Sequence, residues 1–267
     1  MRHGLLIVIA LLAFACSQPA PVPTAPQASF LVTVNDGNIA APDTVAAGWQ
    51  TMRVQEDGAG HIVVAFRLNG NTTTAGVAAF LAALDTARIT PAEAVAIGGP
   101  EIGDSGDVVV NMTPGTYVLA CVRRHDDGHR HASRGEWHVV EAVGPAQGEP
   151  PVDSVIEVSM ADFAYVTQVP WHAGQRTIKV ANVGREDHQL RIDRLRAGAT
   201  LQEWIAAEDR SRLSEPIAGV ARTGQGQTVY LPIDLPAGSY VLYCLVPSAS
   251  TGEPHAMLGM IRTVVVE

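Results

Sequence analysis

The feature that most constrains the fold is an internal repeat that divides the chain into two similar halves. Landmarks of the first half recur in the second half, in the same order, at an offset of 123 to 127 residues. They are Ala47-Gly48 and Ala173-Gly174, His61 and His188, Gly115-Thr-Tyr-Val-Leu-Ala-Cys121 and Gly238-Ser-Tyr-Val-Leu-Tyr-Cys244, and His131-Ala132 and His255-Ala256. Chance does not place so many landmarks in one order, so the sequence predicts two copies of one domain.

A segment rich in Pro and Gly separates the two halves. It covers residues 144–152 (GPAQGEPPV) and is typical of a linker. We therefore expect a first domain over residues 29–143 and a second over residues 153–267.

Short β-branched runs separated by Gly and Pro turns make up most of each half, which is typical of an antiparallel β-sandwich. The opening strands are expected at residues 30–34 and 155–159. Each half also contains a helical stretch after its first histidine, at residues 75–84 and 200–208. In the second stretch Thr200 precedes Glu203 by three residues, which predicts a capping box. The predicted fold class is all-β, with two tandem Greek-key sandwiches that each carry a short helical insert.

The first sixteen residues are typical of a secretory signal. Arg2 and His3 precede an apolar run that ends at Ala15, directly before Cys16. The run is too short to span a bilayer of about 30 Å as a helix. Two outcomes are open: lipidation of Cys16, because small residues before a cysteine resemble a bacterial lipobox, or ordinary signal-peptidase cleavage. Residues 17–28, rich in Pro and Ala, are expected to form an extended tether. The sequence predicts an exported protein of the periplasm or cell envelope, anchored through Cys16.

Charge and cysteine content narrow the possible partners. The net charge of −9 makes nucleic acid and anionic lipid surfaces poor partners. Besides Cys16, the chain contains only Cys121 and Cys244, which occupy the same position of their repeats. A disulfide requires Cα atoms within about 7 Å. Because two separate cores would hold these cysteines farther apart, we expect them to be unbridged.

Four potential metal ligands mark the second half: His188, Cys244, His255 and Met260. Ten residues separate Cys244 from His255, and four separate His255 from Met260. Two imidazoles, a thiolate and a distant thioether form the donor set of a blue-copper site, in which soft sulfur stabilises Cu(I) and imidazole suits Cu(II). A buried cysteine and a methionine in an apolar strand are also ordinary core residues, so this structural alternative stays open.

The runs Asn182-Val-Gly-Arg-Glu-Asp-His188 and Pro254-His255-Ala-Met-Leu-Gly-Met260 resemble the ligand segments of cupredoxins, the blue (type 1) copper proteins. The resemblance covers both halves and implies tandem cupredoxin-like domains. It further implies His188, Cys244 and His255 as equatorial copper ligands and Met260 as the axial ligand. Met257 is an alternative thioether whose spacing fits less well. The loop between Cys244 and His255 is longer than in plastocyanin or azurin, but loop closure costs little extra entropy as length grows.

The first half retains His61, Cys121 and His131 as a possible second metal site, but Glu136 stands where the second half has Met260. A carboxylate in place of a thioether gives a harder site. His125 and His129 are further donors in the same loop, and the neighbouring pair of arginines, 123–124, disfavours a cation. A loose metal site, a solvated pH-responsive surface and a degenerate structural repeat are therefore all open.

Enzyme signatures are missing from the sequence. The residues on either side of the two cysteines are not histidines, whereas in two-domain nitrite reductases and multicopper oxidases such a histidine connects the blue site to a catalytic copper. There is also no nucleophile elbow, phosphate loop or zinc-protease motif. We therefore expect a protein that is not an enzyme.

Two functions remain open on the sequence alone. One is an envelope copper protein for electron transfer or copper holding, with a redox or copper-transfer partner. The other is a metal-free cupredoxin-like interaction module. If copper binds, the donor atoms of His188, Cys244 and His255 should lie roughly 3 to 4 Å apart, and a separation above about 6 Å would exclude a single metal. We expect these three donors to lie closer together than His61, Cys121 and His131 of the first half.

Overall fold

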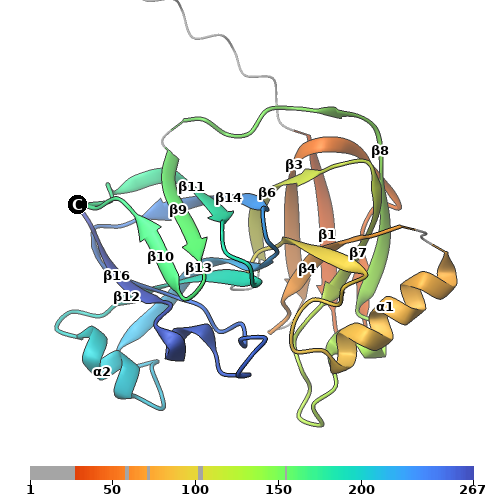
Figure 1. Ribbon diagram of the computed structural model, residues 1–267. Helices are drawn as coiled ribbons and strands as arrows, with labels where there is room; N and C mark the ends of the chain where they lie inside the picture. The colour runs from red at the N-terminus through yellow and green to blue at the C-terminus, as the bar shows by residue number, and fades with distance from the viewer. Residues whose placement is uncertain (1–27, 58–59, 71–72, 102–104, 154) are drawn as a thin grey trace, which may run out of the picture.

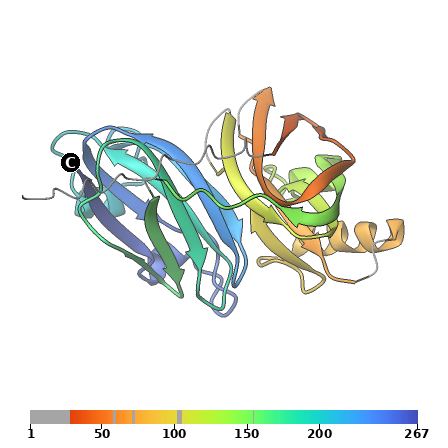
Figure 2. The same cartoon turned by 90° about the horizontal axis from the view of Figure 1, so that it is seen from above.

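The structure is a computed structural model that describes residues 28–57, 60–70, 73–101, 105–153 and 155–267. It contains two β-rich lobes that lie side by side, one for each half of the repeat (Figures 1 and 2). The expected signal segment, Cys16 and the tether up to residue 27 lie outside the described residues. Within the described part of the chain, no helix is long and apolar enough to cross a membrane.

The N-terminal lobe is made of short strands interrupted by one helix. Its elements are β1 (Ser29–Asn35), β2 (Asn38–Ala40), β3 (Thr44–Asp57), β4 (Val63–Leu68), α1 (Thr74–Thr86), β5 (Ala94–Gly98), β6 (Ser105–Met112), β7 (Gly115–Cys121), the 3₁₀ helix η1 (His131–Arg134) and β8 (Trp137–Gln147).

The C-terminal lobe repeats these elements in the same order. They are β9 (Val155–Ala161), β10 (Ala164–Thr167), β11 (Gly174–Asn182), β12 (His188–Leu195), α2 (Leu201–Ala206), β13 (Ser214–Thr223), β14 (Thr228–Leu235), β15 (Gly238–Tyr243), η2 (His255–Leu258) and β16 (Ile261–Val266). The predicted fold class is confirmed: both lobes are β-sandwiches with a short helical insert.

Each sandwich consists of two sheets. In the C-terminal lobe, one sheet has the order β10-β9-β11-β14 and the other the order β13-β12-β15-β16. In the N-terminal lobe, the long strand β3 belongs to both faces. Residues 44–48 of β3 pair in parallel with β8, while the rest of β3 pairs with β1 and β6. The strands bury alternate residues, as β1 does with Phe30, Val32 and Val34, because successive side chains of a strand point to opposite faces.

The two helices form where the sequence predicts them. Helix α1 is capped by Thr73, whose Oγ1 accepts a hydrogen bond from the amide of Gly76. Its residues Val77, Phe80 and Leu84 are buried against the sandwich. Helix α2 has the predicted capping box of Thr200 and Glu203.

The lobes meet edge to edge through β6 and β14, which occupy equivalent positions in the two repeats. Val110 pairs with Val229 and Val109 pairs with Tyr230, both antiparallel, so one sheet continues from lobe to lobe. The strands of each half stay together in this order and are not interleaved. Residues 144–147 of the expected linker continue strand β8, because Gln147 pairs with Gly48. The domain boundary at residues 144–152 stays a prediction.

Candidate metal centres

The pairing of β12 with β15 brings the first two predicted donors of the C-terminal lobe together. These strands are antiparallel, with Arg191 opposite Tyr243, so the start of β12 and the end of β15 lie at one end of the sandwich. His188 is the first residue of β12, and Cys244 directly follows β15. The amide of Gln189 donates a hydrogen bond to the Cys244 Sγ at 3.5 Å. Residues 56 positions apart in the sequence are thus neighbours in space.

The third donor, His255, returns to this place because the loop after Cys244 closes on itself. His255 begins η2, and Gly259 ends η2 in the left-handed conformation at φ 110°. The amide of Cys244 donates to the Met260 carbonyl oxygen, and the Met260 amide donates to the His255 carbonyl oxygen. Met260 is fully buried, whereas Met257 is 70% exposed, which favours Met260 as the thioether.

We call His188, Cys244 and His255 the C-terminal site. The two Nδ1 atoms of His188 and His255 are 2.9 Å apart, and the Cys244 Sγ is 3.5 Å from the His255 Nδ1. All three side chains are buried, and their donor atoms lie within 4.8 Å of one another. A tetrahedral ion with bonds of 2.0 to 2.3 Å has ligand-to-ligand distances of roughly 3.3 to 3.5 Å. The trio therefore has a size that suits one metal ion.

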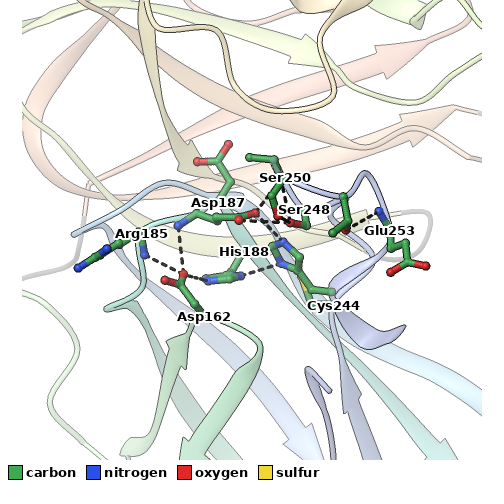
Figure 3. A network of polar contacts seen from close by, with 12 residues as sticks. Asp162, Arg185, Asp187, His188, Cys244, Ser248, Ser250 and Glu253 are labelled. Atoms are coloured by element: carbon green, nitrogen blue, oxygen red, sulfur yellow. Dashed lines mark hydrogen bonds and ion pairs between the residues drawn. The ribbon is translucent and has the colours of Figure 1, made fainter. Parts of the chain in front are cut away.

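In each histidine of this site, Nδ1 faces the other histidine and Nε2, the outer nitrogen, lies beside a carboxylate. Figure 3 shows this contact for Asp162 and His188. The His188 Nε2 lies 3.1 Å from the Asp162 Oδ1, and the His255 Nε2 lies 3.0 Å from the Glu186 Oε2. Burial tends to raise the pKa of Asp162. Hydrogen bonds from the backbone amides of Glu186 and Arg185 and from His188 outweigh this effect, so that the pKa is lowered. Both histidines are thus oriented by ionised carboxylates.

The proton count of the two imidazoles favours a cation between them. When an imidazole is neutral it carries one N–H, and a carboxylate beside Nε2 favours the tautomer with the hydrogen on that atom. The facing Nδ1 atoms, 2.9 Å apart, then both present lone pairs. Burial is the largest cause that lowers the pKa of His188, which favours its neutral form. Two lone pairs that point at one another in a buried site are the arrangement that a metal ion satisfies.

Cys244 is a buried thiol in this site. Burial raises the pKa of Cys244 to about 12, while the amides of Gln189 and Val246 oppose the shift by hydrogen bonding to the sulfur. A metal ion would displace the thiol proton, because metals bind the thiolate. The donor set of two imidazoles and one thiolate fits a type 1 copper site.

The N-terminal lobe has an equivalent cluster, which we call the N-terminal site: His61, Cys121, His131 and Glu136. The Glu136 Oε2 lies 2.8 Å from the His61 Nδ1 and 3.0 Å from the His131 Nδ1. The Cys121 Sγ lies 3.9 Å from the His61 Nδ1. The four donor atoms all lie within 4.8 Å of one another. Glu136, which occupies the sequence position of Met260, therefore contributes a carboxylate oxygen to this cluster.

The histidine-rich loop beside the N-terminal site does not act as one group of donors. His129 pairs with Asp85 on α1 at 2.7 Å, and His125 stacks on His131 with ring centroids 4.0 Å apart. Arg124 donates to the carbonyl oxygens of Asp85 and Ala87 at the end of α1, and the expectation that the two arginines disfavour a cation stays a prediction. The guanidinium of its neighbour, Arg123, lies against Gly60.

The two cysteines lie in different lobes, and both are buried and free. The expectation that they do not bridge agrees with the structure. Sequence reasoning missed both outer carboxylates. Glu186 lies within the run that ends at His188 and could have been suspected there, whereas Asp162 lies in a turn 26 residues earlier and gives no sequence signal.

Residues on either side of His188 are held by the N-terminal lobe. The Asp187 Oδ2 accepts hydrogen bonds from the amide and the hydroxyl of Thr90. The Gln189 Nε2 donates to the Oε1 of buried Glu101 at 3.1 Å. The contact between the lobes therefore fixes the position of the strand that begins with a predicted metal ligand.

Comparison with known proteins identifies structures but no sequence families. No protein-family model and no curated protein sequence matches the chain. A reduced auracyanin from Roseiflexus castenholzii is 20% identical over 44% of this chain and 99% of its own length, with a TM-score of 0.32. A multicopper oxidase is 16% identical over 91% of this chain and 92% of its own, with a TM-score of 0.25. A copper-containing nitrite reductase from Thermus scotoductus is 12% identical over 90% of this chain and 61% of its own, also with a TM-score of 0.25.

Identities and scores this low carry no inference about activity. The class to which this architecture corresponds follows from the chain itself: tandem β-sandwiches, each with buried imidazole and thiol donors gathered at one end. The fold and donor set are cupredoxin-like, as the sequence resemblance implies.

The expectation that the protein is not an enzyme is wrong as stated. The matched structures include a multicopper oxidase and a copper nitrite reductase, each over at least 90% of this chain, and both are enzymes. The enzyme status of this chain is left open.

Proposed function

We propose that this chain is a copper-binding electron-transfer protein whose copper is held by the C-terminal site. His188, Cys244 and His255 would be the equatorial ligands, with Met260 as the axial thioether. The observation that carries the proposal is the pair of buried Nδ1 atoms 2.9 Å apart, whose outer nitrogens are both bound to carboxylates. A copper ion held there would supply one-electron redox chemistry.

The protein residues support this chemistry by rigidity and by exclusion of water. All three donors are fully buried, and the loop that carries His255 is closed by backbone hydrogen bonds to Cys244 and Met260. Ligands held in place change position little between oxidation states. Such rigidity suits electron transfer to a partner protein, and it also suits copper holding, the second role that this donor set allows.

Copper binding is tested by adding Cu(II) to the purified full chain and recording the visible spectrum. We expect an intense thiolate-to-copper charge-transfer band, with one copper ion per chain bound at the C-terminal site. The variant Cys244→Ser should lose the band, and the matched variant Cys121→Ser in the other lobe should keep it. A wild-type protein that binds no copper would leave the metal-free interaction module as the better account.

We also propose that the protein is exported and anchored to the cell envelope through Cys16. The support is in the sequence: a short apolar segment that ends in Ala-Phe-Ala before Cys16, followed by a segment rich in Pro and Ala. Fractionation of expressing bacteria tests this proposal. The wild-type chain should be found with membranes and the variant Cys16→Ala in the soluble exported fraction; equal distribution of the two chains would contradict the anchor.

A further inference from the structure

The N-terminal site differs from the C-terminal site in one ligand position, and this difference changes the metal that it suits. We propose that His61, Cys121, His131 and Glu136 form a closed binding site for Zn²⁺ that stabilises the N-terminal lobe. This site is independent of the copper site proposed above. The proposal rests on the placement of Glu136, the position of His61 between two carboxylates and the closed donor set.

Glu136 is held so that one of its oxygens faces both histidines. The amide of Gly37 donates to the Oε1 at 3.1 Å, and the Oε2 lies 2.8 and 3.0 Å from the Nδ1 atoms of His61 and His131. The Glu136 carboxylate is therefore buried and aimed at the other donors.

His61 lies between two carboxylates. The His61 Nδ1 faces the Glu136 carboxylate, and the buried His61 Nε2, which has no hydrogen-bond partner, lies 3.5 Å from the Asp36 Oδ1. A metal ion bound to Nδ1 would leave Nε2–H pointing at Asp36. In the second repeat the equivalent residue, Asp162, is closer and lies 3.1 Å from the His188 Nε2.

The chemistry of the four donors selects a borderline divalent ion. Imidazole, thiolate and carboxylate are the ligand types that Zn²⁺ binds, and here the protein supplies all four ligands, as it does in structural zinc sites. The carboxylate and the thiolate together neutralise a dication, whereas Cu(I) prefers the softer thioether that the other lobe supplies. His61, Cys121 and Glu136 are buried, the His131 side chain is 13% exposed, and the four donor atoms lie within 4.8 Å of one another.

The positions of the ligands explain how the ion would stabilise the lobe. His61 precedes β4, Cys121 ends β7, His131 begins η1 and Glu136 precedes β8. One ion would thus join three neighbouring strands and the loop between them. Binding to the folded state alone raises stability in proportion to the logarithm of metal concentration over the dissociation constant.

The test uses the full chain with the substitution Cys244→Ser, which removes the thiolate of the other lobe. We expect one Zn²⁺ to be retained after dialysis and to raise the melting temperature. Co²⁺ as a spectroscopic substitute should give the visible bands of a tetrahedral ion with a thiolate ligand. A further substitution, Cys121→Ser, should abolish the thiolate band. Glu136→Gln removes a direct ligand and should weaken zinc binding by about 100-fold or more, since loss of an outer partner of a ligand already costs about 10- to 100-fold. In the wild-type chain, one equivalent of Cu(I) should leave the zinc in place.

Several results would overturn the zinc site. They are a chain that retains no zinc and shows no cobalt bands, zinc binding that survives Cys121→Ser, and zinc displaced by one equivalent of Cu(I). Circular dichroism of each variant identifies loss of folding, and the cobalt spectrum of the Cys244→Ser chain decides the question without any substitution in the N-terminal site. Failure of the copper proposal is seen separately, as a missing copper band in the wild-type chain.

Discussion

At the scale of single residues, Asp162 and Glu186 set the chemistry of the C-terminal site through the outer nitrogens of its histidines. Carboxylates in this position fix the imidazole tautomer and raise the basicity of the ligand nitrogen. Each is held by further hydrogen bonds: Asp162 by the amides of Arg185 and Glu186, and Glu186 by the amide of Ala249. The orientation of the histidines is therefore built into the backbone around them.

Replacement of Glu186 by Gln should weaken copper binding by about 10- to 100-fold, because the neutral amide accepts the His255 hydrogen bond less strongly. Competition with a chelator of known affinity measures the effect. Glu253→Gln is the matched control, since Glu253 is an exposed residue of the nearby loop and its replacement removes the same charge. Equal copper affinities for the two variants would show that the contact does not orient His255.

At the scale of elements, strand β3 makes the N-terminal sandwich possible by passing from one sheet to the other. The change of partner occurs next to Gly48, which has φ +116°. A Cβ atom at this position would lie only 1.9 Å from the carbonyl oxygen of Gln147 on β8. Gly48 therefore permits both the backbone conformation and the close approach of the neighbouring strand.

The variant Gly48→Ala should lose about 3 kcal/mol or more of unfolding free energy, from the left-handed backbone and from the collision with β8. Gly198→Ala serves as the control, because Gly198 has φ +83° but no neighbouring atom within 4 Å of the place that a Cβ would occupy. It should lose only about 1 kcal/mol. Denaturant unfolding of both variants provides the comparison, and similar losses would argue against the collision.

At the scale of the whole molecule, the lobes are joined by a continuous sheet and by buried polar contacts. Glu101 of the N-terminal lobe lies at this contact, where it accepts a hydrogen bond from Gln189 and lies 3.6 Å from the Arg191 Nε. Burial raises the pKa of Glu101 to about 7, while the charges of Arg191 and Arg222 oppose the rise. In the folded protein Glu101 therefore binds a proton more tightly than in the unfolded chain.

This shift predicts a pH dependence of stability. Between pH 4.5 and about 7 the folded state holds the Glu101 proton and the unfolded state does not, so this residue makes stability fall as pH rises. The full effect is about 3 kcal/mol. Other groups also titrate in this window, since the pKa of His188 is lowered. The measured quantity is therefore the difference in unfolding free energy between the wild-type chain and Glu101→Gln. The wild-type chain should become less stable relative to the variant as pH rises. A constant difference would contradict the raised pKa.

Much of this architecture could be predicted from local sequence patterns. The repeat appears when the two halves are compared, and the strand patterns and the capping box at Thr200 depend on residues close together in the chain. The structure confirms the two sandwiches and their helical inserts. Reasoning from missing motifs was less successful, because their absence did not exclude an enzyme.

The sequence by itself determined the repeat, the fold class and the identity of the candidate donors, because these are properties of residue type and spacing. Tertiary structure alone decided which groups meet: strand pairing sets His188 beside Cys244, a distant turn supplies Asp162, and the lobe contact places Glu101 against Gln189. Such contacts depend on the register of strands far apart in the chain, and each is worth little until the whole sheet has formed. Local patterns determine which face of each strand is buried, but not which distant strand it pairs with.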